Sequence, residues 1–321
     1  MKKDALISTW LQVTQTAFDS GRPYSVLRFD ENCRAEVFIG MTRSGQRCLI
    51  LNEAVPANKP IEREKLSLIY DNSIPGMVLL LSDDTYKDLF DELISSMYVA
   101  VKDLDSKQDA VEIFRAHFIK WTTFFDSDFS SKLSDDAVMG LVGELKVLES
   151  LVADADELSI NTVLEAWRGP YDESQDFVLD DQLVEVKTIG TRSREVKISS
   201  LQQLTAVEGK DLSLLVNTTF PDDENGSSIG SLVISVRDRA IYLLGDVTIL
   251  YKALGQKGLH PKNLDDYEHL RFGFRGEHIY NVLSDDFPKL SSDNISEGII
   301  SARYTITLSA LQPFMTTSKE Y

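Results

Sequence analysis

Cysteine and long apolar runs are scarce in this sequence. Its 321 residues contain two cysteines, Cys33 and Cys48, which excludes a disulfide framework and a cysteine-based zinc site. No apolar run approaches the roughly 18 residues of a membrane-spanning helix. The start, MKKDALISTW, turns polar too early for a secretory signal peptide. These absences predict a soluble, cytoplasmic protein.

Positive charge is also in short supply. Lys plus Arg number 33 against 51 Asp plus Glu, which gives a net charge of −18. Such a chain is a poor free-standing binder of phosphate backbones, so contact with nucleic acid would need a local basic patch, a metal ion or a partner protein. The hydrophobic content of 43% is ordinary and is sufficient for a sizeable core.

The hydrophobic pattern divides the chain into three regions. Residues 1–130 open with a helical pattern, continue as short strand-like runs typical of an antiparallel meander, and end in a helical, acidic stretch from Asp84 to Phe125. Acids of this stretch are most simply a solvated face: Asp88, Asp91, Glu92, Asp103, Asp105 and Asp109. Residues 226–321 form a mixed region, with strands expected at 232–236, 241–244 and 304–308 and a helix at 247–254.

Residues 131–225 predict an α+β core in the order helix, three strands, helix, strand. Ser134 places a capping hydroxyl before a helix that runs to about Ala153. The following elements are a strand near 162–167, a hairpin over 176–189, a short helix over about 199–208 and a strand at 212–219.

The hairpin contains a paired set of charged residues. Alternation places Glu185 and Lys187 on one face of its second strand. A turn centred on Asp180 and Asp181 pairs position i with position 361 − i, so Asp176 is expected opposite Glu185. Directly opposed like charges are unfavourable unless something positive lies between them. A divalent cation such as Mg²⁺ or the Lys187 ammonium would serve.

A third acid, Glu144, falls within a predicted apolar helix stripe formed by Ala137, Leu141, Leu148 and Leu151. A carboxylate on a packed helix face is costly unless it is paired or binds a metal. Gly140 and Gly143 flank it and would let another backbone approach closely.

These residue types suit metal-assisted phosphodiester hydrolysis. Asp176 and Glu185 would bind the cation, Lys187 would orient water or stabilise developing negative charge, and Glu144 would complete the metal's surroundings. Each residue also has a purely structural interpretation. The E-x-K segment can be an exposed strand face, Asp176 a strand-start residue, and Glu144 a satisfied half-buried acid.

Together, the helix Glu144, Asp176 and the Glu185-x-Lys187 segment resemble the PD-(D/E)XK nuclease superfamily, with Gln175 where the signature has proline. The resemblance implies a restriction-endonuclease-like core and a Mg²⁺ (or Mn²⁺) site formed by Glu144, Asp176, Glu185 and Lys187. Further segments resemble a bacterial family of PD-(D/E)XK proteins: Trp167–Pro170 before Asp176-Phe177, Lys197–Leu204 and Ala302–Ser309. This resemblance implies a role in phage defence or restriction, with helicase-type ATPase and methyltransferase partners.

The resemblance also suggests a polar residue on the helix after the E-x-K strand, which could be Gln202 or Gln203; Gln203 is the candidate. A local basic patch, Arg192, Arg194 and Lys197, is a candidate DNA contact or simply a solvated loop. The leading hypothesis is a Mg²⁺-dependent DNA endonuclease subunit, which could act as a homodimer. The alternative is a catalytically quiet assembly or recognition subunit that binds partner proteins.

Overall fold

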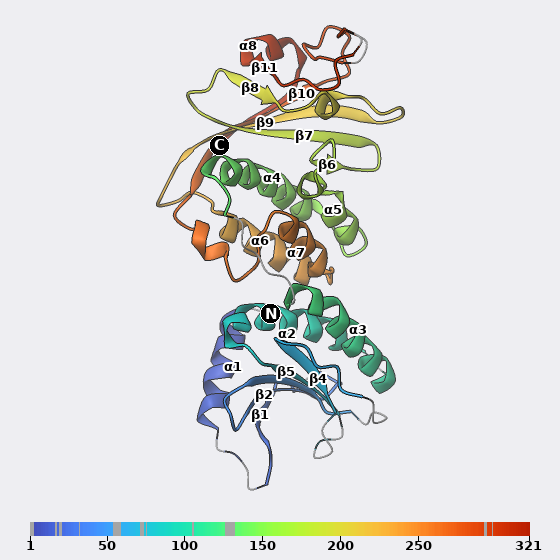
Figure 1. The fold of residues 1–321 in the computed structure, drawn as a ribbon, viewed down its shortest axis with the longest axis vertical. Helices are drawn as coiled ribbons and strands as arrows, with labels where there is room; N and C mark the ends of the chain where they lie inside the picture. Colours follow the sequence, from blue (N-terminus) through green and yellow to red (C-terminus); the bar gives the residue numbers. More distant parts are fainter. Residues whose placement is uncertain are drawn as a thin grey trace. The chain divides into compact units, whose positions relative to one another are not determined.

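The computed structural model describes residues 3–16, 18, 21–31, 33–53, 59–70, 74, 76–104, 106–125, 132–291, 294–296 and 298–321 (Figure 1). Its contacts divide the chain into two compact units. Unit 1 comprises Met1–Phe129 and Asp246–Thr248, and unit 2 comprises Ser130–Gly245 and Ile249–Tyr321. In the described part of the chain, no helix is both long and apolar enough to cross a membrane.

Unit 1 is an antiparallel sheet with strand order β1-β2-β3-β5-β4, on which α1 packs against β1 and β2. Its elements are α1 (Lys3–Gln15), β1 (Tyr24–Arg28), β2 (Val37–Thr42), β3 (Arg47–Leu51), β4 (Leu66–Ile69), β5 (Met77–Leu81), a 3-10 turn (Asp84–Tyr86), α2 (Lys87–Val101) and α3 (Lys107–Phe125). The expected meander is present, and β4 is a strand that the sequence pattern did not predict.

Two acids predicted to be solvated are buried in unit 1. Asp91 and Glu92 are each 8% exposed. Asp91 accepts hydrogen bonds from Trp10 Nε1 at 2.8 Å and from Arg47 Nη1 at 2.9 Å. The prediction was wrong for these two acids. For Asp91, partners from α1 and β3, which are distant in sequence, offset the cost of burying the carboxylate. Asp88, Asp103 and Asp109 are exposed as predicted, and Asp105 lies outside the described residues.

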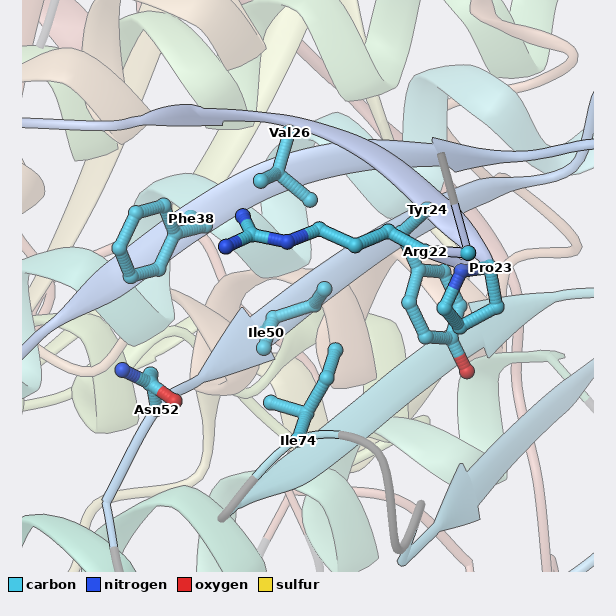
Figure 2. Close-up of a pocket in the computed structure, with 9 residues that line it drawn as sticks. Arg22, Pro23, Tyr24, Val26, Phe38, Ile50, Asn52 and Ile74 are labelled. Carbon is cyan, nitrogen blue, oxygen red and sulfur yellow. The ribbon is translucent and has the colours of Figure 1, made fainter. Parts of the chain in front are cut away.

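Unit 1 also contains a cavity of about 360 Å³ beside β1, β2 and β3 (Figure 2). Its lining is mainly apolar, and the Arg22 side chain extends along it. The lining residues are Gly21, Arg22, Pro23, Tyr24, Val26, Phe38, Ile50, Asn52 and Ile74. The candidate site residues predicted from the sequence all belong to unit 2.

Unit 2 is built on a mixed sheet of order β12-β10-β9-β7-β6, in which β7 and β9 run parallel and the other neighbours run antiparallel. Its helices are α4 (Asp135–Asp154), α5 (Ile160–Ala166), α6 (Ile229–Tyr242), α7 (Val247–Gln256, whose first two residues are assigned to unit 1) and α8 (Leu308–Leu311). Its strands are β6 (Phe177–Val178), β7 (Gln182–Gly190), β8 (Glu195–Ile198), β9 (Asp211–Pro221), β10 (Phe272–Asn281), β11 (Tyr304–Thr307) and β12 (Met315–Glu320). The 3-10 turns are η2 (Gly169–Tyr171), η3 (Leu201–Leu204), η4 (Leu264–Tyr267) and η5 (Gln312–Phe314).

The layers of unit 2 position the candidate site. Helices α4 and α5 lie against one face of the sheet, with α6 and α7 beyond them, while β8, β11 and α8 lie on the other face (Figure 1). A core that includes Leu183, Leu214, Val196 and Leu204 fills the space between the sheet and the layer of β8 and η3. The chain therefore has the α+β architecture with a mixed sheet that the sequence predicts.

Several elements of unit 2 differ from the prediction. The segment expected to be a strand near Thr162 is helix α5, and the two strands expected at 232–236 and 241–244 are one helix, α6. Short apolar runs do not distinguish a strand from a buried helix. A capping box between Ser228 and Ser231 begins α6. The helix expected over 199–208 is the short turn η3, and β10 and β12, from region 226–321, extend the sheet of β7 and β9.

Candidate functional site

The hairpin of β6 and β7 brings Asp176 beside the middle of β7. Phe177 pairs with Val184, which is the register that the expected turn gives. Asp176 itself precedes β6, and its carboxylate Oδ2 accepts a hydrogen bond from Val186 N at 2.8 Å. The carboxylate thus satisfies a backbone donor of β7 beyond the end of β6.

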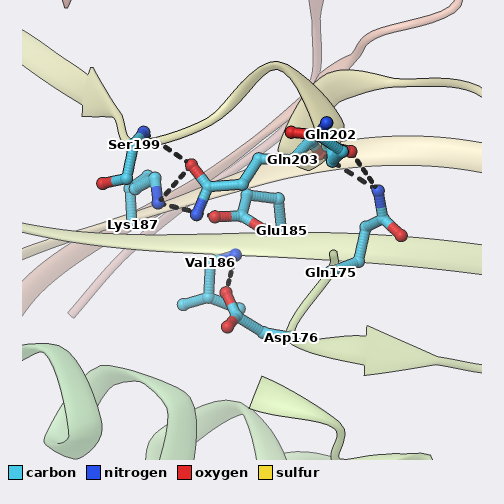
Figure 3. A network of polar contacts seen from close by, with 8 residues as sticks. All are labelled: Gln175, Asp176, Glu185, Val186, Lys187, Ser199, Gln202 and Gln203. Atoms are coloured by element: carbon cyan, nitrogen blue, oxygen red, sulfur yellow. Dashed lines mark hydrogen bonds and ion pairs between the residues drawn. The ribbon is translucent and has the colours of Figure 1, made fainter. Parts of the chain in front are cut away.

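Glu185 and Lys187 extend from β7 toward η3, whereas the next residue along, Thr188, faces α4. Figure 3 shows Asp176 reaching β7 from the other side of the strand. The two carboxylates therefore flank the β7 backbone instead of facing each other directly, as the hairpin pairing alone suggested. Their charges still interact, and the negative charge of Asp176 contributes to raising the pKa of Glu185.

Lys187 is held between two oxygen acceptors. Its Nζ donates to Glu185 Oε1 at 2.5 Å and to Gln203 Oε1 at 3.3 Å. Gln203 Oε1 also accepts from Ser199 N at 2.7 Å, which fixes the amide (Figure 3). Of the two candidate glutamines, Gln203 therefore contacts the site, while the side chain of Gln202 is exposed.

The segment before β6 holds Glu144 and Asp176. Trp167 Nε1 donates to Glu144 Oε2 at 2.8 Å, and the backbone N–H groups of Arg168 and Gly169 donate to the Asp176 carbonyl at 2.7 and 3.0 Å. A Cβ atom on Gly169 would lie 2.5 Å from Glu144 Oε2 and 2.7 Å from Asp176 Oδ1, so both carboxylates crowd this glycine. The sequence predicted no role for Trp167 or Gly169, although the Trp167–Pro170 segment resembles a motif of the PD-(D/E)XK family described above.

Glu144 occupies the edge of the buried face of α4. Its side chain is partly buried. The buried face is rotated relative to the predicted stripe, since Ala137 is exposed and Leu151 is only partly buried. The residues that form it include Val138, Leu141, Val142, Leu145, Leu148 and Val152.

The carboxylates lie in an environment that disfavours their charged forms. Burial is the main cause that raises the pKa of Glu144 to about 8; the charge of Asp176 contributes to this shift, and the Trp167 hydrogen bond opposes it. Burial likewise raises the pKa of Glu185 to about 8, with Asp176 adding to the shift and Lys187 opposing it. Glu185 Oε2 is buried without a hydrogen-bond partner. The site therefore lacks positive charge relative to its acids.

This donor set fits a hard divalent cation. Carboxylate oxygens are the ligands that Mg²⁺ prefers. The buried Glu185 Oε2 has no hydrogen-bond partner and could coordinate such an ion. Asp176, Glu185 and Glu144 are the residues that would hold it. Among the described residues, no three His, Cys, Asp or Glu side chains already form a metal-binding group. Binding would therefore require these side chains to adjust.

The predicted basic patch lies downstream of β7. Arg192 and Arg194 are exposed in the turn after β7. Lys197 is exposed on β8, where it pairs with Thr305 of β11. Their exposure leaves them accessible to a phosphate backbone.

Two glycines of α4 provide a matched test of helix packing beside the site. A Cβ on Gly143 would lie 1.7 Å from Thr188 Oγ1, whereas a Cβ on Gly140 would meet nothing within 4 Å. We expect Gly143→Ala to lower the free energy of unfolding by about 1–3 kcal/mol, because α4 must move from β7. Gly140→Ala should raise it by about 0.5–1 kcal/mol, because alanine favours the helix. Urea unfolding of both variants measures the difference, and equal stabilities would contradict the close approach.

Comparison with known protein families identifies a match for most of the chain. The family model DUF4420, described as "Putative PD-(D/E)XK family member", matches residues 7–309. The match spans both units and contains all four residues of the predicted site. Neither the curated proteins nor the solved structures that were compared gave a match.

Proposed function

The chain belongs to this PD-(D/E)XK family, and from that premise we propose that it is a metal-dependent nuclease that hydrolyses DNA phosphodiester bonds with Mg²⁺ or Mn²⁺. The observation that carries the proposal is the gathering of Glu144, Asp176, Glu185 and Lys187 around β7, with Glu185 Oε2 buried and unpartnered.

The roles follow from the contacts of each side chain. A bound Mg²⁺ supplies Lewis-acid chemistry, polarising a phosphoryl oxygen and lowering the pKa of water. Lys187 is positioned to orient the attacking water or to stabilise negative charge on the phosphate. Gln203 holds the Lys187 ammonium, and Val186 N–H holds the Asp176 carboxylate. Trp167 holds the Glu144 carboxylate through its indole N–H.

We also propose that the protein works with partners. The net charge of −18 opposes unaided binding to DNA. Arg192, Arg194 and Lys197 are the proposed local contacts to the duplex. A phage-defence or restriction-like system with a helicase-type ATPase and a methyltransferase would supply the remaining affinity, and a homodimer would allow both strands to be cut.

A second candidate is a quiet assembly subunit with the same fold. The contact that favours it is the Lys187–Glu185 ion pair, in which the ammonium already neutralises one acid of the site. In this case the chain would bind partner proteins and DNA without cutting.

Nicking of supercoiled plasmid tests the proposed function. The purified protein, alone and reconstituted with the proteins encoded beside its gene, is incubated with Mg²⁺, with Mn²⁺ and with EDTA. We expect nicking that requires the metal. Absence of nicking in every reconstituted sample with either metal would reject the nuclease and favour the quiet subunit.

A further inference from the structure

A second lysine is connected to the segment that borders the site, although it is distant in sequence. Lys257 directly follows α7, and its Nζ lies 2.8 Å from Asp172 Oδ1, 85 positions away in the sequence. Asp172 ends the turn η2, where its backbone N–H donates to the Gly169 carbonyl at 3.2 Å. Gly169 is the residue that Glu144 and Asp176 crowd. Lys257 is thereby tied to the segment that borders both carboxylates.

The charge of Lys257 reaches these acids. Burial is the largest influence on the pKa of Glu144 and of Asp176 and raises both. Lys257 and Lys187 each act in the opposite direction on both carboxyl groups. The site therefore has two lysines near it, of which Lys187 is already bonded to Glu185 and Gln203.

Lys257 is more readily available to a ligand than Lys187. Its side chain is 29% exposed and that of Asp172 is 90% exposed, compared with 17% for Lys187 and 1% for Glu185. An ion pair this exposed contributes little to stability, so another anion can replace Asp172 at small cost. A backbone phosphate offers the same type of charged oxygen acceptor.

We propose that Lys257 binds a backbone phosphate of nucleic acid at the edge of the carboxylate site, and that Asp172 competes with that phosphate for the ammonium. This inference rests on the proposed nuclease function and names a contact to its substrate. It explains why an acidic chain would place a lysine next to a cluster of acids, where phosphate must approach despite the repulsion of the carboxylates.

Binding, measured separately from cleavage, tests this contact. The affinity of the full-length protein for a fluorescent 30-base-pair duplex is measured at pH 7 in EDTA over a series of salt concentrations. We expect Lys257→Gln to weaken binding roughly threefold to tenfold and to reduce the salt slope by about 1. Lys257→Arg keeps the charge and should keep most of the affinity. Lys252→Gln, which removes an exposed lysine of α7, is the matched control and should change little.

Removing the charge of Asp172, which competes with the phosphate, is expected to strengthen duplex binding. Asp172 has φ 57°, a left-handed conformation that asparagine also tolerates, so Asp172→Asn removes the charge and keeps the backbone. This variant should bind the duplex roughly twofold to fivefold more tightly than the wild type. The double variant Asp172→Asn/Lys257→Gln should lose that gain, because no ammonium remains to be released.

The results separate this inference from the proposed function. Weaker binding by Lys257→Gln supports the inference even if the wild type does not nick plasmid. Equal duplex affinity of the wild type, Lys257→Gln and Lys252→Gln overturns it even if the wild type nicks. Wild-type protein that does not bind the duplex at low salt, either alone or reconstituted with the proteins encoded beside its gene, overturns it as well.

Discussion

Asp176→Asn is expected to reduce metal-dependent plasmid nicking at least ~100-fold, because it removes a carboxylate that would hold the cation. Asparagine keeps an oxygen that can accept from Val186 N–H, so the β7 edge should stay intact. Lys187→Met should cause a loss of similar size, because it removes the ammonium that we propose orients water or stabilises charge on the phosphate. Initial nicking rates at saturating Mg²⁺ measure both effects.

The control for these variants lies in the same hairpin. Asp180 is an exposed acid of the turn between β6 and β7, and asparagine is equally suited to that turn. Asp180→Asn should nick at the wild-type rate. Nicking that persists undiminished in Asp176→Asn and Lys187→Met would show that these residues do not perform the chemistry.

Glu185→Gln is expected to stabilise the metal-free protein at pH 8 and to abolish most of its stabilisation by Mg²⁺. Burial raises the pKa of Glu185 to about 8 from an ordinary value of 4.5. Between these values the folded state holds a proton that the unfolded state has released. The wild type should therefore lose stability as pH rises from 5 to 8, by roughly 1 kcal/mol per pH unit for such a group.

Thermal unfolding with and without Mg²⁺ measures this effect. Glutamine carries no charge to bury, so the stability of the variant should decline less steeply with pH. At pH 8 its melting temperature should be roughly 2–4 °C higher for each kcal/mol of unfolding free energy that the substitution restores. Mg²⁺ at 100 times its dissociation constant should stabilise the wild type by about 2.7 kcal/mol. Superimposable pH profiles, together with equal Mg²⁺ shifts in the two proteins, would contradict the account of Glu185.

Local signals predicted the parts of the site that lie on α4 and the β6–β7 hairpin. The Ser134 hydroxyl begins α4, since it accepts from Ala137 N, and the turn at 180–181 sets the register of the hairpin. Alternation along β7 placed Glu185 and Lys187 on one face. These features depend on residues within a few positions of each other, and a single sequence contains that information.

The remaining features depend on contacts between distant segments. Nothing local to Trp167 indicates that its indole reaches Glu144, 23 positions earlier. Lys257 has no motif around it, and its ion pair with Asp172 joins two segments that lie 85 positions apart in the sequence. The hydrogen bond from Val186 N–H to Asp176 also depends on where β6 begins. Because β6 has only two residues, an alternating pattern cannot locate its start. The apolar runs within 229–242 predicted two strands, whereas the segment forms one helix, because short apolar runs do not distinguish a strand from a buried helix.

We propose that Glu144, Asp176 and Glu185 bind one cation beside Lys187. Crystals soaked in Mn²⁺ test it directly, because the anomalous signal locates the ion without assumptions about its ligands. We predict a single strong peak at β7, about 2.0–2.3 Å from carboxylate oxygens of Asp176 and Glu185. A map at millimolar Mn²⁺ with no peak there, and with the Lys187 ammonium still on Glu185, would contradict it.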